Sequence, residues 1–119
     1  MDRRALIREY KRTPRPAGLF SVRNTASGRC LIGVGADLPG TLNRQRFQLE
    51  MGSHPDKELQ RDWNELGADS FVIEVLDELD PSENSEGDLA SDLAALKQAW
   101  IEKLEQAGQD LYPMTKRRT

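Results

Sequence analysis

Cysteine and histidine are almost absent from this chain of 119 residues, in which each occurs once, as Cys30 and His54. A single cysteine cannot close a disulfide within the chain, and one cysteine with one histidine cannot supply the ligands of a structural zinc site. A disulfide scaffold and a zinc-finger module are therefore excluded. The scarcity of cysteine favours a reducing, cytoplasmic location.

Long apolar runs are missing as well. No stretch reaches the roughly 18 consecutive apolar residues that a membrane span requires, and the first residues, MDRR, lack the apolar core of a signal peptide. We therefore expect no membrane association. Hydrophobic residues still make up 37% of the chain and charged residues 31%, which is enough apolar material for one domain with a modest core.

Charge is divided unevenly along the sequence. Residues 1–46 contain ten Lys and Arg against three Asp and Glu, a balance of +7, whereas residues 47–119 contain seven against seventeen, a balance of −10. The acidic part argues against a protein whose whole surface binds nucleic acid, while the basic part leaves room for a local phosphate-binding face. The same uneven distribution of charge would result if the charged residues only lined the solvent-exposed faces of helices and bound no ligand.

The pattern of apolar and turn-forming residues predicts an α+β fold. Strands are expected at 18–23 and 29–34, joined as a hairpin by turn residues, and at 70–76. Helices are expected at 2–12, 38–51, 55–66 and 88–107. The predicted architecture is a three-stranded antiparallel sheet, the hairpin plus one later strand, flanked by helices. A polar, acidic segment at 80–87 is expected to be an exposed loop.

Helix ends and helix faces refine this prediction. Asp37 is expected to cap the helix at 38–51, and Ser53 the helix at 55–66. The apolar stripe of the helix at 55–66 is predicted to consist of Leu59, Trp63 and Leu66. The buried face of the last helix is predicted to consist of Leu89, Leu93, Leu96, Trp100 and Leu104.

Three segments follow from this division of the chain. Residues 1–16 are expected to form a basic helix and a proline-containing linker, residues 17–112 the domain itself, and residues 113–119 a basic tail that is frayed from Met114 onwards.

Gly33 and Gly35 follow the second predicted strand, as in a loop that binds a phosphate. A dinucleotide fingerprint requires a third glycine, and Leu38 stands in its place. The preceding strand is the return strand of a hairpin rather than the first strand of a βαβ unit. The two glycines therefore indicate the end of a strand and the turn into a helix.

The hairpin also carries a longer pattern. Gly18-Leu19-Phe20, ten intervening residues, and Leu31-Ile32-Gly33 resemble the paired GIY and YIG motifs of the GIY-YIG nuclease superfamily. Residues 52–79, GSHPDKELQRDWNELGADSFVIEVLDEL, are similar to the family segment G-x-H-x-N-x-x-L-Q-x-x-(W/F)-N-x-x-G and its following strand. The last helix, LKQAWIEKL, resembles the family's terminal helix. The resemblance covers roughly residues 17–112 and implies a compact GIY-YIG-like domain.

The resemblance implies a specific chemistry and also a departure from it. GIY-YIG enzymes cleave phosphodiesters with two motif tyrosines, an arginine in the following helix and a glutamate that holds one divalent metal. The corresponding positions of this chain are Phe20, Leu31, Thr41 and Lys97. No catalytic residue of the family is then intact, and no metal or other cofactor is expected. Arg44, one turn after Thr41, leaves a displaced arginine open.

The resemblance and the basic N-terminal half together predict a degenerate endonuclease-like domain that binds DNA or RNA without efficient cleavage. The residues proposed to contact nucleic acid are Arg23, Arg29, Arg44, Arg46 and His54. His54 could instead make only a local contact with Ser53 or Asp56. Lys97 falls between Leu104 and Ile101 on the helical wheel, where its amine would replace the charge of the metal or extend past the core edge to water.

Two other functions stay open from the sequence. One is an active, Mg²⁺-dependent endonuclease with displaced catalytic residues. The other is a protein-interaction module, which includes a homodimer, and the acidic charge of residues 47–119 favours it.

Overall fold

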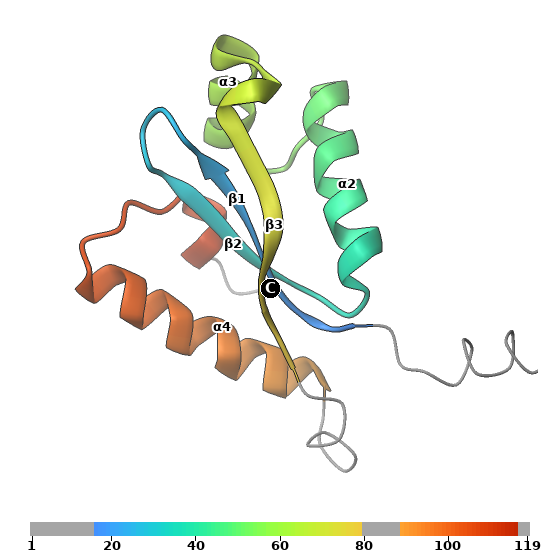
Figure 1. Cartoon of the computed structure of the whole chain (residues 1–119), viewed down its shortest axis with the longest axis vertical. Coiled ribbons are helices and arrows are strands. Elements are labelled where there is room, and N and C mark those ends of the chain that lie inside the picture. The colour runs from blue at the N-terminus through green and yellow to red at the C-terminus, as the bar shows by residue number, and fades with distance from the viewer. Residues whose placement is uncertain (1–15, 80–88, 117–119) are drawn as a thin grey trace, which may run out of the picture.

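The structure is a computed structural model that describes residues 16–79 and 89–116 (Figure 1). The predicted helix at 2–12 and the predicted loop at 80–87 lie outside these ranges. None of the helices within them combines the length and the apolar character that crossing a bilayer requires.

Three antiparallel strands form the sheet. β1 (Gly18–Asn24) lies between β2 (Cys30–Gly35) and β3 (Phe71–Glu78), so the sheet order is β2-β1-β3. In the hairpin, Phe20 pairs with Gly33 and Val22 with Leu31. The predicted hairpin with one later strand is therefore confirmed.

Helices cover both faces of this sheet. α2 (Leu38–Met51) and α3 (Lys57–Leu66) lie on one face, and α4 (Leu89–Gln106) lies on the other (Figure 1). Two short 3₁₀ helices follow α3 and α4, η1 (Ala68–Ser70) and η3 (Pro113–Lys116). The α+β class is confirmed.

Alternate side chains of β1 divide the core between these layers. Phe20 and Val22 face α2 and α3, where they join Leu38, Leu49, Leu59, Trp63 and Tyr112. Leu19 faces α4 and joins Ile32, Ile101 and Leu111. The indole of Trp100 on α4 also donates a hydrogen bond from Nε1 to Asp77 Oδ2 of β3, at 2.9 Å.

Two predicted members of the helix faces are wrong. Leu66 is 45% exposed because it is the last residue of α3, and Leu89 is 37% exposed because it is the first of α4. Helix ends extend beyond the sheet that they cover, so the periodic pattern overestimates their burial. Ile101, which the predicted face omits, is buried.

The predicted cap of the second helix is also wrong. Asp37 caps α2 as expected, but the carboxylate that caps α3 belongs to Asp56, which accepts a hydrogen bond from Leu59 N at 3.1 Å. Ser53 belongs to the end of α2 instead. Gly52 takes the left-handed conformation there, and Ser53 N donates to Gln48 O at 2.8 Å, as in a Schellman motif.

The packed domain extends past the boundary that the sequence suggests at residue 112. Thr115 is fully buried, and its Oγ1 accepts a hydrogen bond from Ile32 N of β2 at 3.0 Å. Met114 N donates to Asp56 Oδ2 at 2.9 Å. The segment Pro113–Lys116 is therefore a part of the fold, and fraying, which the sequence predicts from Met114 onwards, is not found at Met114–Lys116.

Asp56 thus holds two segments at once, and its removal tests the corrected cap. Asp56→Ala is expected to lower the free energy of unfolding by about 1–3 kcal/mol, because it leaves the backbone N–H groups of Leu59 and Met114 without their acceptor. Ser53→Ala should change it by less than about 0.5 kcal/mol. Urea unfolding of both variants measures the difference, and equal losses would contradict the assignment.

Candidate functional site

The two positions that resemble the motif tyrosines lie inside the core. Phe20 is 4% exposed and Leu31 is 5% exposed. The Phe20 ring packs on Gly33, where a Cβ would stand 2.5 Å from Phe20 Cζ, so the ring can lie there only over a glycine. Neither side chain has a group that can transfer a proton.

Thr41, which the resemblance matches to the family's arginine, is buried near the start of α2. Its Oγ1 would lie 2.5 Å from a Cβ at Gly35, so this glycine lets the helix approach the end of β2 closely. Arg44 is exposed one turn further on, and Arg46 is exposed about 160° around the helix from Arg44. The side of α2 near Thr41 therefore presents Arg44 to solvent.

Lys97, which the resemblance matches to the metal glutamate, is half-buried on the other side of the sheet. It lines a cavity of about 630 Å³ between the end of β2 and α4, and burial lowers the pKa of its amine. Phe20, Leu31 and Thr41 are not among the residues that line this cavity. The four positions do not form one common pocket.

The divalent metal that the resemblance implies does not fit these side chains. Such a metal prefers carboxylate oxygens, and an ammonium repels it. No residue that lines the Lys97 cavity has a carboxylate. Across residues 16–79 and 89–116, moreover, no three His, Cys, Asp or Glu side chains are grouped as metal ligands.

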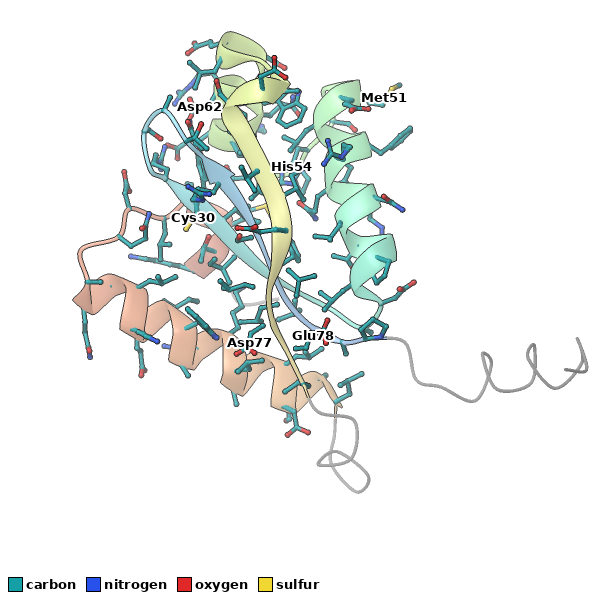
Figure 2. The ribbon with its side chains drawn as sticks, in the orientation of Figure 1. Cys30, Met51, His54, Asp62, Asp77 and Glu78 are labelled. Atoms are coloured by element: carbon teal, nitrogen blue, oxygen red, sulfur yellow. The ribbon has the colours of Figure 1, made fainter. Side chains whose placement is uncertain are left out.

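His54 is buried between α2 and α3 (Figure 2). Its Nδ1 accepts a hydrogen bond from Asp56 N at 3.0 Å. The proton must therefore be on Nε2, which donates to Gln45 Oε1 at 2.6 Å. Burial lowers the pKa of the imidazole. The local contact with Asp56 is present, and both ring nitrogens are bound within the protein.

Gln45 and Gln60 support this histidine, and neither role is evident from the sequence. Gln60 Oε1 accepts from His54 N, and Gln60 Nε2 donates to Leu49 O, each at 3.0 Å. Gln60 thus joins α3 to the end of α2. Gln60 belongs to the segment 52–79 that resembles the family motif, and this position could have indicated that it has a structural role.

Arg29 is bound by the protein on several sides. Its guanidinium lies 3.3 Å from Glu58 and 3.4 Å from Asp110, and it stacks at 4.3 Å over the ring of Tyr112. The Tyr112 hydroxyl donates to Asp62 Oδ2 at 2.7 Å, and burial raises its pKa to about 12. Arg29 therefore stabilises the C-terminal segment and is only 20% exposed.

The remaining arginine, Arg23, is exposed on the face of β1 that α4 covers, next to Cys30. Cys30 is buried, and burial raises the pKa of its thiol, which makes it unreactive. Of the five proposed nucleic-acid contacts, the structure brings only Arg44 and Arg46 onto one element. Arg23 lies across the sheet from them.

The comparisons with known proteins identify the fold. No family model and no curated protein matches the sequence. A solved structure of the catalytic domain of the homing endonuclease I-TevI matches with a TM-score of 0.62 and 22% identity, over 79% of this chain and 94% of that chain. A variant of the same catalytic domain matches with a TM-score of 0.61 and 21% identity, over 87% of this chain and 97% of that chain.

This chain has the GIY-YIG-like fold. The resemblance seen in the two hairpin motifs is thereby confirmed at the level of the backbone. At this identity the likeness shows the fold alone, and the roles of single residues in the GIY-YIG-like domain rest on its own geometry.

The His54 contacts predict a pH dependence of stability. The native state disfavours the protonated imidazole, so below the ordinary pKa of 6.5 the unfolded state binds more protons, and stability falls as the pH falls. Urea unfolding between about pH 7.5 and 5.5 should show this decrease. His54 is the only histidine of the chain, and the His54→Asn variant should show a flatter profile. Parallel profiles would contradict the prediction.

Proposed function

We propose that this GIY-YIG-like domain binds nucleic acid, DNA or RNA, through the exposed side of α2 and does not cleave it by metal-dependent hydrolysis. The observation that carries the absence of cleavage is the burial of Phe20 and Leu31 in the core, and the exposed arginines of α2 support the binding. This burial takes the positions that resemble the catalytic tyrosines out of contact with any substrate.

Hydrolysis of a phosphodiester needs an activated water, a cation beside the reacting phosphate and, in this family, a bound metal. Phe20 and Leu31 cannot accept a proton, Thr41 has no positive charge, and Lys97 cannot replace a carboxylate ligand. The four substitutions thus remove each part of the centre. An enzyme that had lost only the base, the cation or the metal ligand could keep some activity through the other two, whereas this chain lacks all three.

The proposed binding surface is the outer side of α2, which Arg44 and Arg46 flank from positions about 160° apart around the helix. Neither guanidinium has an ion pair with any residue that the structure describes, and the single carboxylate on α2 is Glu50, near its end. A guanidinium binds phosphate oxygens well because its N–H groups form a planar fork. The similar solved structure is named an endonuclease, an enzyme class that acts on nucleic acid.

The other proposed contacts are placed less well for this role. Arg23 would form a separate contact on the far side of the sheet. Arg29 and His54 would have to leave their internal partners before they could bind a phosphate. We therefore assign the binding surface to α2.

A second candidate function is protein interaction, and one observation favours it. Phe47 is 61% exposed and Met51 is 65% exposed on the same outer side of α2, and Met51 points away from the sheet (Figure 2). Large apolar side chains that are exposed together mark docking surfaces in many proteins. This surface overlaps with the two arginines, so binding experiments must separate the two functions.

Fluorescence anisotropy with labelled single- and double-stranded DNA and RNA tests the first proposal. Binding should weaken as salt rises, and Arg44→Gln/Arg46→Gln should lower the slope of log K against log salt on duplex DNA by about one for each lost phosphate contact. Lys57→Gln/Arg61→Gln on α3 is the matched control, with the same charge change and little expected effect.

Absence of binding at low salt, or equal losses from the two double variants, would contradict the proposal. A dimer in light scattering that Phe47→Ser converts to a monomer, together with absent nucleic-acid binding, would support the second candidate.

A further inference from the structure

The cavity beside Lys97 has walls from three parts of the chain. They are the end of β2 at Val34 and Gly35, one side of α4, and the end of η3. Its volume of about 630 Å³ lies within the range of roughly 300–1,000 Å³ that is usual for sites that bind small molecules. It lies beside α4, whereas the proposed nucleic-acid surface lies on α2.

The walls are apolar except for a few groups. Leu93, Ala94 and Ile101 of α4 line the cavity together with Val34 of β2. The charged residues among the lining are Lys97 and Lys116, and no carboxylate is present there. This combination of apolar walls and a cationic end is typical of sites for organic anions.

The two lysines differ in their partners. Lys116 Nζ is 2.8 Å from Glu105 Oε2, so its charge is largely neutralised by the protein. Lys97 is half-buried and has no hydrogen bond or ion pair with any residue in the described ranges. A partly desolvated ammonium without a counter-ion is unfavourable. An anion in the cavity would remove this cost.

We propose that the cavity binds a small organic acid with an apolar body, whose acid group contacts Lys97 Nζ and whose body packs on Leu93, Ala94 and Ile101. The walls favour such a ligand over the backbone of a nucleic acid, because a phosphodiester chain is strongly hydrated and has no apolar part to bury. The site is independent of the proposed function, since α2 and α4 cover opposite faces of the sheet.

Calorimetric titration of the full chain with octanoate tests the proposal. Octanoate should bind, while acetate, which lacks the apolar body, and inorganic phosphate should bind far more weakly. Lys97→Gln should weaken octanoate binding about tenfold, the effect of losing one charge-assisted contact. It should leave the weak binding of octan-1-ol unchanged. Lys103→Gln on the same helix is the charge-matched control and should have no effect.

A second pair of variants tests the location. Ala94 lines the cavity and Ala95 does not, although both are exposed on α4. Ala94→Trp should fill the cavity and abolish octanoate binding, whereas Ala95→Trp should preserve it. Thermal unfolding of both variants confirms that they fold, and Lys97→Gln tests the site without added bulk.

Absence of octanoate binding, equal affinities in Lys97→Gln and Lys103→Gln, or equal affinities in the two tryptophan variants would overturn the proposal. Binding of an oligonucleotide or of inorganic phosphate that is lost in Ala94→Trp would also overturn the proposal, because the cavity would then bind phosphate. Nucleic-acid binding measured on the same preparations is expected to be the same in Ala94→Trp as in Ala95→Trp. Failure of the cavity proposal is therefore distinguishable from failure of the α2 proposal.

Discussion

The contact between the Phe20 ring and Gly33 is the interaction on which the rest of this domain depends. It joins the central strand β1 to the edge strand β2, and the same side of the hairpin carries Val22 and Leu31. α2 and α3 close over these side chains and form one of the two layers of the core. Phe20 and Leu31, which the resemblance matches to the motif tyrosines, are therefore packing residues in this structure. A polar reacting group there would have to be buried.

The C-terminal segment explains why several polar residues are not free to act on a ligand. Asp56 binds both α3 and Met114, and Tyr112 stacks against Arg29 and donates to Asp62. The bonds of Asp56 and Asp62 hold the C-terminal segment against α3, and the bond from Ile32 N to Thr115 Oγ1 holds η3 against β2. The surfaces that we propose to be functional are instead the outer side of α2 and the cavity beside α4.

The sequence was sufficient for the features that depend on neighbouring residues. The hairpin, the capping of α2 by Asp37 and the order of the elements follow from local patterns, and the motif resemblance led to the GIY-YIG-like fold. Hydrogen bonds and ion pairs between side chains of distant segments could not be predicted. Nothing in the sequence indicates that Arg29 and His54 have internal partners. Only the folded chain brings Asp110 next to Arg29 and Gln45 next to His54. Likewise, the sequence predicts Ser53 as a helix cap. In the structure the left-handed Gly52 directs the backbone N–H of Ser53 to Gln48 O, so Ser53 closes the preceding helix instead.

The proposal that this chain has lost the cleavage centre is tested most directly by incubating supercoiled plasmid DNA and a mixed-sequence RNA with the purified chain. The reactions contain Mg²⁺ or Mn²⁺, and parallel samples contain EDTA. Because Phe20, Leu31, Thr41 and Lys97 cannot supply the base, the cation and the metal ligand together, we expect no nicking above that of buffer alone. Nicking that increases with protein concentration and disappears with EDTA would contradict this expectation.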